Sequence, residues 1–175
     1  HVEASRMIQL VNDILQLSHL DNVSETGAAP AMETVDLLDV ARECVERQKV
    51  NARHSYISLT YLGESAPVTG SRVLLDELCQ NLCDNAIRYN RPGGKVQLIT
   101  SCTRDGHCTL TVKDNGIGIP KDAQSSVFER FYRVDKSRSK ATGGTGLGLA
   151  IVKHIARIHN ARIKLESCLL YTSDA

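Results

Sequence analysis

Apolar and polar residues follow two different periods along the chain, and each period predicts a type of secondary structure. Between residues 4 and 20, apolar side chains recur at alternating steps of three and four residues, as in the heptad seam of a coiled coil or helical bundle. The seam consists of Met7, Leu10, Ile14 and Leu17, widened by Val11 and Leu20. A narrow seam followed by the polar stretch DNVSETGAAP favours one helix of a hairpin or bundle over a helix that packs on its own domain.

The middle of the chain combines helical and strand periods. Amphipathic helices are predicted from Val35 to about Arg53 and from about Arg72 to Tyr89, and the second ends at the breaker sequence NRPGG. Strands are predicted at 56–61, 67–69, 95–103 and 107–113, and the last two form a hairpin around Asp105-Gly106. Helices mixed with antiparallel strands predict a two-layer α+β fold.

Towards the C-terminus, loops alternate with short regular elements. The turn DNGIGIP at 114–120 is followed by a charged stretch at 133–140 and a glycine loop. This loop opens a predicted helix that ends near His159, and a strand is predicted at 162–166. Residues 168–175 contain no turn signal.

Length and charge narrow the class of protein. A chain of 175 residues is long enough for one main domain with a helical appendage. Its formal net charge of +1 does not provide the excess of Lys and Arg that marks a nucleic-acid-binding surface. No apolar run reaches the ~18 residues that cross a bilayer, so we expect this fragment to contact neither nucleic acid nor membrane.

The cysteines give no metal-binding pattern. Six cysteines stand at positions 44, 79, 83, 102, 108 and 168, without a C-x-x-C pair. Cys79 and Cys83 are four residues apart on a predicted helix and therefore share a face. A metal site would need further ligands at matching spacing, which the sequence lacks. We therefore expect reduced, mostly buried thiols.

The stretch ATGGTGLGLAIV at 141–152 places four glycines within six residues. It fails the dinucleotide fingerprint G-x-G-x-x-G, because Leu149 and Ile151 occupy the last glycine position counted from Gly144 and Gly146. It also fails the P-loop pattern, because Leu149 stands where a lysine is required. Glycines that let the backbone approach a ligand, followed by a helix N-terminus, still predict an anion site of unnamed type.

Three polar residues recur every four positions on the longer predicted helix. Glu77, Asn81 and Asn85 share one face, with Arg88 and Tyr89 at its C-terminal end. Such a column can be the solvent face of an amphipathic helix. Two asparagines are unusual there because Asn is a poor helix former. Their amide oxygens and the carboxylate suit Mg²⁺, which takes few protein ligands alongside phosphate and water oxygens.

Two further segments contain candidate functional residues. DNGIGIP follows a predicted strand, but Asp, Asn and Gly are ordinary turn residues, so its signal is weak when taken alone. VFERFYR, at 127–133, leads into a basic segment. The basic residues of this segment are Arg133, Lys136, Arg138 and Lys140. A charged loop of this kind is usually only a solvated surface.

Together the four segments resemble the ATP-binding domain of sensor histidine kinases, within the wider family of DNA gyrase, MutL and the ninety-kilodalton heat-shock chaperone. ELCQNLCDNAIRY resembles the N box, DNGIGIP the first glycine box, VFERFYR the F box and GGTGLGLAIV the second glycine box, in the family's order and spacing. SRMIQLVNDILQLSHLD resembles the second helix of the dimerisation hairpin. The resemblance covers residues 4–167.

The resemblance implies a Bergerat-type α+β fold, in which helices cover a mixed, mostly antiparallel sheet and one hairpin helix precedes the sheet. The implied domain order is part of the hairpin helix at 1–22, a linker at 23–34, the ATP-binding domain at 35–167 and a tail at 168–175. The family usually continues through a Gly-containing turn into one more strand, whereas residues 168–175 contain no turn signal, so we expect them to be a truncated or non-native tail.

The resemblance also implies roles for the residues of the N box. Asn81 would coordinate Mg²⁺ on the ATP phosphates with Asn85 nearby, and Glu77 would orient or activate the attacking group. Arg88 would meet phosphate, and Tyr89 would lie against the adenine or ribose.

The glycine boxes and the segment between them would complete the ATP contacts. Asp114 would accept a hydrogen bond from the adenine amino group, which guanine cannot donate at that position. Gly116 and Gly118 would let the backbone pass close to the base, and residues 133–142 would form a lid. The remaining implied contacts are Ile119, Phe131, Arg133, Gly144, Thr145, Gly146, Leu147 and Gly148.

The implied reaction is transfer of the γ-phosphoryl group of ATP, with Mg²⁺, to a histidine on the neighbouring hairpin helix. Transfer to an aspartate in the receiver domain of a response regulator would follow, in the cytoplasmic portion of a membrane-anchored bacterial kinase that is a homodimer when intact. The acceptor motif, a His followed by Glu or Asp and Arg-Thr-Pro, is absent, so we expect no self-phosphorylation on a hairpin histidine. The alternatives are a stand-alone ATPase of this superfamily and a nucleotide-responsive interaction module.

Overall fold

The computed structural model of the chain describes residues 2–26, 30–132 and 146–167. The chain divides into two compact units. The central unit is Pro30–Ile117, and the terminal unit combines residues 1–29 with residues 118–175. The N box and the Asp114 turn therefore belong to the central unit, whereas the F box and the second glycine box belong to the terminal unit.

The central unit contains two helices and five strands. In chain order its elements are β1 (Glu33–Asp36), α2 (Leu37–His54), β2 (Ser58–Gly63), β3 (Pro67–Gly70), α3 (Arg72–Arg88), β4 (Lys95–Cys102) and β5 (Cys108–Asp114). β2 pairs in parallel with β4, and β4 pairs in antiparallel fashion with β5, whereas β1 and β3 form a separate antiparallel pair. This mixed arrangement confirms the predicted α+β class.

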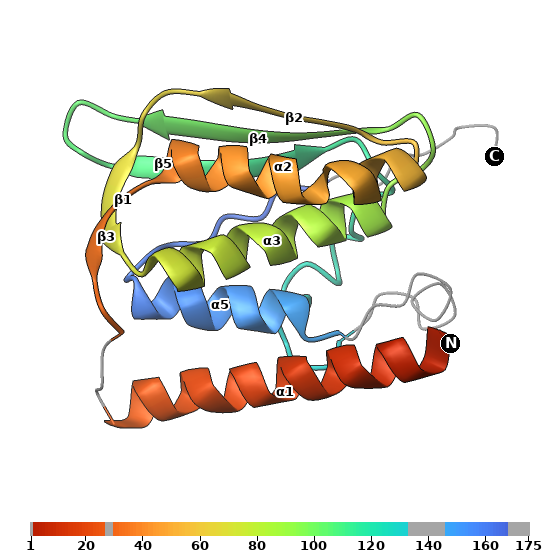
Figure 1. Cartoon of the computed structure of the whole chain (residues 1–175), viewed down its shortest axis with the longest axis horizontal. Coiled ribbons are helices and arrows are strands. Elements are labelled where there is room, and N and C mark those ends of the chain that lie inside the picture. The colour runs from red at the N-terminus through yellow and green to blue at the C-terminus, as the bar shows by residue number, and fades with distance from the viewer. Residues whose placement is uncertain (1, 27–29, 133–145, 168–175) are drawn as a thin grey trace. The chain divides into compact units, whose positions relative to one another are not determined.

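Helices α2 and α3 lie side by side against one face of the sheet formed by β2, β4 and β5 (Figure 1). The hydrophobic core of this unit contains nine apolar residues that are at most 2% exposed: Val40, Ala41, Cys44, Ala52, Ala66, Cys79, Cys83, Val96 and Leu98. Val96 and Leu98 alternate with more exposed neighbours along β4, because successive side chains of a strand point to opposite faces. This packing fixes which face of α3 is turned to the sheet. The opposite face of the helix is therefore turned away from the sheet.

Polar side chains fix the first residues of α2 and α3. The Asp36 carboxylate accepts hydrogen bonds from the Leu38 and Ala66 N–H groups, at 3.0 and 2.8 Å, and from the Ser65 hydroxyl at 2.6 Å. The Ser65 bond is the largest of the effects that hold the pKa of Asp36 below its ordinary value. Ser71 caps α3 through a 3.4 Å bond. Both residue types are favoured at the N-cap, so these helix starts follow from local chemistry.

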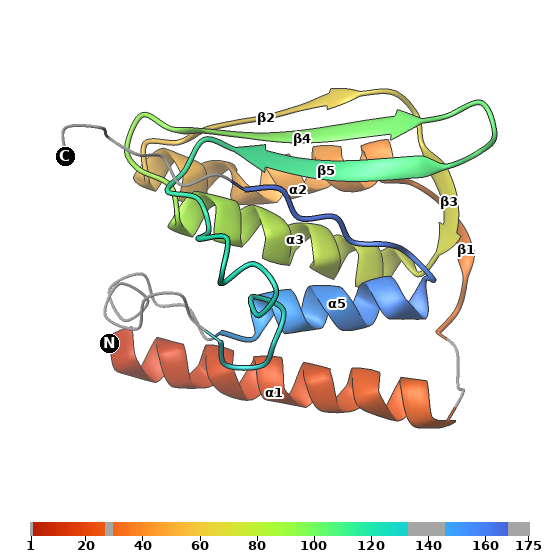
Figure 2. The same ribbon diagram turned by 180° about the vertical axis from the view of Figure 1, so that it is seen from behind.

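The terminal unit pairs α1 (Val2–Thr26) with α5 (Gly148–Ile158), and the two helices lie side by side in both views (Figures 1 and 2). On α1, Leu17 and Leu20 are buried, whereas Met7 and Ile14 are 59% and 44% exposed. The predicted seam is therefore divided: its C-terminal end packs within the terminal unit, and most of its N-terminal part is open to solvent.

Three of the differences from the prediction have a clear physical cause. Helix α1 continues through Thr26, past the predicted end at residue 22, because the sequence contains no Gly or Pro before Gly27. The next helix was predicted to begin at Val35, but Val35 lies in strand β1. Helix α2 begins only after its N-cap residue Asp36. The C-terminal strand predicted at 162–166 is wrong: this described segment forms no ladder, and Ile163 is 41% exposed. Alternating residues become a strand only where a partner accepts their backbone hydrogen bonds.

The five cysteines that the structure describes fall into two groups. Cys44, Cys79 and Cys83 are free and buried, as predicted. Cys102 and Cys108 form a disulfide at the end of the β4–β5 ladder, so the prediction of reduced thiols was wrong for this pair. Disulfide pairing depends on cross-strand register, which the spacing of the cysteines in the sequence does not reveal.

Candidate nucleotide-binding site

The polar column of α3 lies on the side of the helix away from its buried residues. Glu77, Asn81 and Asn85 are half-buried, whereas Cys79 and Cys83 on the other side are fully buried. The Asn81 amide nitrogen donates a 3.0 Å hydrogen bond to the Glu77 carbonyl oxygen, which orients the amide. Among the described residues the Asn81 Oδ1 atom has no hydrogen-bond partner, so it remains available as an oxygen ligand.

The C-terminal end of α3 meets the turn that follows β5, and both belong to the central unit. The Ile117 N–H donates to the Tyr89 carbonyl oxygen at 3.1 Å. A Cβ atom added to Gly116 would lie 2.6 Å from the same oxygen, so only glycine fits this contact. Arg88, predicted to meet phosphate, forms an ion pair of 3.1 Å with Asp84 in this structure.

Asp114 ends β5 and is exposed to solvent. Its Oδ1 atom accepts a 2.8 Å hydrogen bond from the Gly116 N–H, which closes a local turn. Its Oδ2 atom has no hydrogen-bond partner in the part of the chain that the structure describes. A carboxylate held through one oxygen presents the other as an acceptor of fixed direction, which suits recognition of an amino group.

Two asparagines that the sequence analysis did not single out hold this turn in place. The Asn115 Oδ1 atom accepts a 2.7 Å hydrogen bond from the Lys95 N–H, and the Asn90 amide nitrogen donates to the Lys95 carbonyl oxygen at 3.2 Å. Asn90 also requires glycine at position 94, where a Cβ atom would lie 2.1 Å from its Oδ1 atom. Asn90 lies in the turn sequence NRPGG and Asn115 in the turn sequence DNG, so the sequence explained both asparagines as ordinary turn residues.

We expect Asn115→Ala to weaken ATP binding about tenfold, because the Lys95 N–H would lose its acceptor and the Asp114 turn its anchor. Asn115→Asp retains an acceptor oxygen and should keep most of the affinity. Calorimetric titration with ATP compares the two variants. Equal affinities in the alanine and aspartate variants would contradict a positioning role for the Asn115 oxygen.

In the terminal unit, the F box meets the second glycine box. The Phe131 N–H donates to the Gly146 carbonyl oxygen at 2.9 Å, and the Phe131 side chain is 56% exposed. Gly146 has φ +77°, and a Cβ atom there would lie 2.9 Å from the Phe131 Cα. Leu147, the N-cap of α5, is buried, and its apolar side chain offers no cap to the N–H groups of the first helical turn.

We expect Gly146→Ala to cost about 1–2 kcal/mol for the left-handed backbone alone, and to lower ATP affinity because the Phe131 backbone must also move. Gly106→Ala is the matched control, because Gly106 has φ +90° and nothing within 4 Å of an added Cβ atom. Urea unfolding and ATP titration should show a stability loss in both variants and an affinity loss only in Gly146→Ala. Unchanged ATP affinity in Gly146→Ala would count against the assignment of this loop.

The first glycine box continues into the terminal unit at Gly118, which has φ +78°. The Ile119 N–H donates a 2.7 Å hydrogen bond to the Ser167 hydroxyl, and the Gln124 amide nitrogen donates to the carbonyl oxygens of both Ile119 and Ser167 at 3.0 Å. Ser167 and Gln124 had no recognisable sequence signal, because their contacts join segments more than forty residues apart.

An ionic cluster joins α1 to the F box and α5 within the terminal unit. The Arg130 guanidinium donates to the Asp21 carboxylate at 2.7 Å, and His154 Nε2 lies 3.4 Å from the other Asp21 oxygen. The Arg130 bond is the largest effect on the pKa of Asp21, which lies below its ordinary value. Burial lowers the pKa of His154, and its Nδ1 atom is buried without a hydrogen-bond partner among the described residues.

Acidification should loosen the terminal unit. Because the folded pKa of His154 lies below its unfolded value, its neutral form contributes stability that is complete above about pH 6.5 and is lost as the pH falls further. The stability that Asp21 contributes is also lost as the pH falls, but only below its unfolded pKa of about 3.9. We expect the unfolding temperature of His154→Gln to fall less than that of the wild type between pH 7.5 and 5.5. His107→Gln, at an exposed site, should behave as the wild type does.

The structure therefore groups the predicted residues within each unit. Tyr89, Asp114 and Gly116 come together in the central unit, and Phe131 and Gly146 in the terminal unit. Several predicted residues lie outside the described residues. These are Arg133, Gly144, Thr145, the rest of the predicted lid and the tail at 168–175.

Comparison with known proteins assigns the family. Residues 70–172 match the family described as "Histidine kinase-, DNA gyrase B-, and HSP90-like ATPase". The chain belongs to this family. The matched range contains all four sequence boxes, from the N box on α3 to the second glycine box that opens α5.

Individual histidine kinases are similar over most of the chain. The sensor-like histidine kinase SenX3 of Mycolicibacterium smegmatis is 46% identical over 170 residues, covering 94% of this chain and 42% of SenX3. The solved mycobacterial sensor histidine kinase MprB has a TM-score of 0.64 at 35% identity, covering 74% of this chain and 81% of MprB. Full-length ShkA in complex with AMPPNP has a TM-score of 0.71 at 28% identity, covering 89% of this chain and 32% of ShkA.

These similarities identify a catalytic ATP-binding domain of the sensor histidine kinase type. The chain spans less than half the length of the curated relatives it matches. No helix among residues 2–26, 30–132 and 146–167 combines the length and apolar character needed to cross a membrane.

The donor atoms of this ATPase domain fit a magnesium–nucleotide complex better than a metal held by protein alone. Among the described residues there is no group of three or more His, Cys, Asp or Glu side chains that could hold a metal ion. Asn81 instead offers a single oriented amide oxygen. Mg²⁺ commonly takes one or two protein oxygens and completes its shell with phosphate and water, so the residues present fit this ion.

Proposed function

We propose that this chain is the ATP-binding catalytic part of a two-component sensor histidine kinase, which transfers the γ-phosphoryl group of ATP to a histidine outside these 175 residues. The observation that carries the proposal is Asp114, whose Oδ1 atom is held by Gly116 while its Oδ2 atom is presented to a ligand. This arrangement would accept a hydrogen bond from the adenine amino group, beside the α3 end that carries Tyr89. Family membership and the AMPPNP complex of the relative ShkA support an adenine nucleotide as the ligand.

The remaining residues would orient the triphosphate and neutralise its charge. The Asn81 Oδ1 atom, with Asn85 nearby, would hold Mg²⁺ together with the ATP phosphates. When bound, Mg²⁺ supplies positive charge that offsets the charge of the transferred phosphoryl group. Arg88 would exchange its Asp84 partner for phosphate, and Glu77 would orient or activate the attacking group. In the terminal unit, the N–H groups at the start of α5 would bind phosphate oxygens.

The partners of the intact protein follow from the same assignment. The acceptor histidine would lie on the hairpin helix that pairs with α1, and a response regulator receiver domain would take the phosphoryl group next. Five large apolar residues of α1 are at least 44% exposed: Met7, Ile8, Val11, Ile14 and Leu15. Such a face supports a helical partner and a homodimeric bundle in the cytoplasmic part of a membrane-anchored bacterial kinase.

Phosphotransfer to a supplied acceptor tests the proposal. The chain is mixed with a separately produced hairpin carrying a histidine in the His-Glu-x-x-Arg-Thr-Pro motif, γ-labelled ATP and Mg²⁺. We expect acid-labile phosphate on the hairpin and none on the chain itself. Steady ATP hydrolysis that ignores the hairpin would favour a stand-alone ATPase. ATP binding with neither transfer nor hydrolysis would favour a nucleotide-responsive interaction module.

A further inference from the structure

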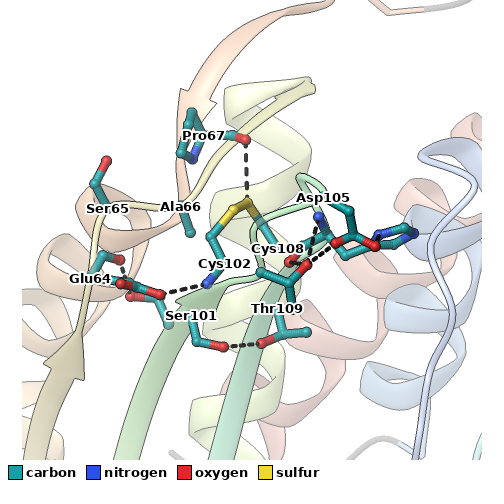
Figure 3. The surroundings of a disulfide bond; sticks show 12 residues. Glu64, Ser65, Ala66, Pro67, Ser101, Cys102, Asp105, Cys108 and Thr109 are labelled. Carbon is teal, nitrogen blue, oxygen red and sulfur yellow. Dashed lines mark hydrogen bonds and ion pairs between the residues drawn. A yellow bond between two sulfur atoms is a disulfide. The ribbon is translucent and has the colours of Figure 1, made fainter.

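The β4–β5 hairpin carries a second chemistry, unrelated to nucleotide binding. We propose that Cys102 and Cys108 form a reversible thiol–disulfide exchange site, whose redox partner is a small thiol or disulfide of the glutathione class. Figure 3 shows the two sulfur atoms bonded at the end of the ladder, next to the segment from Glu64 to Pro67. Three features of the hairpin support this proposal: register, exposure and anchoring.

Register holds the two cysteines together in either redox state. Cys102 and Cys108 are directly opposite in the antiparallel ladder, with Cα atoms 4.0 Å apart. The next pair towards the turn is hydrogen-bonded through the Thr103 N–H and the His107 carbonyl oxygen at 2.9 Å. The cysteines therefore occupy a non-hydrogen-bonded position, where opposing side chains approach most closely. The ladder and the turn at Gly106, with φ +90°, keep the two thiols close without the disulfide.

Exposure separates this pair from the other described cysteines. Cys102 and Cys108 are partly exposed, whereas Cys44, Cys79 and Cys83 are at most 2% exposed. Thiol exchange requires the attacking sulfur to reach a disulfide in solution, so only the hairpin pair of the described cysteines meets this requirement in the folded protein.

The surroundings anchor the hairpin. The Cys102 N–H donates to a Glu64 carboxylate oxygen at 2.9 Å, and the Thr100 hydroxyl donates to the Glu64 carbonyl oxygen at 2.7 Å. The Cys108 sulfur lies 3.5 Å from the Pro67 carbonyl oxygen. A carboxylate therefore neighbours Cys102 and a carbonyl oxygen neighbours the Cys108 sulfur. Both neighbours oppose a thiolate, so either cysteine is a candidate for the first attack.

The exchange needs no reactants other than the protein dithiol and oxidised glutathione. Either hairpin thiolate can attack first. When it is Cys102, the thiolate attacks one sulfur of oxidised glutathione, forming a mixed disulfide and releasing one glutathione thiolate. The Cys108 thiolate then attacks the Cys102 sulfur, forming the Cys102–Cys108 bond and releasing the second glutathione thiolate. Two electrons pass from the protein dithiol to oxidised glutathione, and the two thiol protons pass to solvent or to the released thiolates.

The test uses the full chain in a Cys168→Ser background, which removes the thiol outside the described residues. The reduced protein is equilibrated with mixtures of reduced and oxidised glutathione, quenched with acid, alkylated and mapped by peptide mass spectrometry. We expect a Cys102–Cys108 disulfide that retains no glutathione and reverses when reduced glutathione is in excess. Cys44, Cys79 and Cys83 should be alkylated only after unfolding.

Two single variants test each sulfur separately. In Cys108→Ser, Cys102 should form a stable mixed disulfide with glutathione, and in Cys102→Ser, Cys108 should do the same. Urea unfolding provides an independent readout, because closing the hairpin restricts the unfolded chain and should raise the midpoint of the oxidised wild type. Neither single variant can close the hairpin, so oxidation should not raise its midpoint.

Two results would overturn the proposal. The first is wild-type protein in which both hairpin cysteines retain glutathione or neither reacts. The second is a disulfide that joins one of them to Cys44, Cys79 or Cys83. Neither of these outcomes depends on ATP binding, so the site is judged separately from the proposed kinase function.

Discussion

Asn81→Ala should remove the magnesium dependence of ATP binding. We expect wild-type affinity for ATP to be at least about 100-fold higher with Mg²⁺ than with a chelator, and this ratio to fall to about one in the variant. The reason is the Asn81 Oδ1 atom, which the bond from the amide nitrogen to the Glu77 carbonyl oxygen leaves as an oriented oxygen ligand. Calorimetric titrations with and without Mg²⁺ measure the ratio directly.

This substitution should not unfold the protein, because alanine is a better helix former than asparagine by about 0.7 kcal/mol. Asn51→Ala is the matched control, since Asn51 is an exposed asparagine on α2 whose amide contacts Gln48. The control should retain the full magnesium effect. A magnesium effect that survives in Asn81→Ala would show that another group holds the ion and would remove Asn81 from the proposed site.

Asp114→Asn should change the preferred base. The asparagine oxygen can still accept the bond from the Gly116 N–H, so the turn is kept, but the atom presented to the ligand becomes an amide donor. We expect ATP affinity to fall about 10–100-fold, because the adenine amino group would then face another donor. Inosine triphosphate, which carries a carbonyl oxygen at that position, should bind the variant more tightly than it binds the wild type.

Competition between ATP and inosine triphosphate for a fluorescent nucleotide measures this inversion. Asp122→Asn, at an exposed carboxylate in the terminal unit, is the control and should leave the preference unchanged. An equal loss of affinity for both nucleotides in Asp114→Asn would mean that the substitution disrupts the turn. Unchanged binding of both nucleotides would place base recognition elsewhere.

The two units divide the proposed machinery by its chemistry. The residues proposed for base recognition and for metal binding lie in the central unit, where the sheet, α2 and α3 share one core. The F box and the start of α5 reside in the terminal unit, where Arg130 and His154 meet Asp21 of α1. A substitution at Asp21 or His154 should therefore first lower the stability of the terminal unit. A substitution at Asn115 should instead weaken recognition of the adenine base.

Local sequence was sufficient to predict most helices and the hairpin. The predicted helix 72–89 matches α3 (Arg72–Arg88), and the predicted helix after the glycine loop matches α5 (Gly148–Ile158). Asp105-Gly106 correctly predicted the β4–β5 hairpin. These elements depend on residues three or four positions apart, on caps and on turn residues, all of which are local. The ATPase family could also be predicted from the sequence, because its four boxes are short motifs that occur in the family's order.

Tertiary structure alone decided the features that depend on distant contacts. The segment 162–166 has an alternating pattern but forms no strand, because a strand exists only where a partner completes its ladder. Asn90 and Asn115 look like turn residues, and only the folded chain shows that both bond to Lys95. Cross-strand register places Cys102 opposite Cys108 and makes them a pair, and helix packing brings Asp21 to Arg130. Period and local motif thus determined the elements and the family of this protein. Register and packing between distant segments, which local residues do not encode, determined which side chains meet.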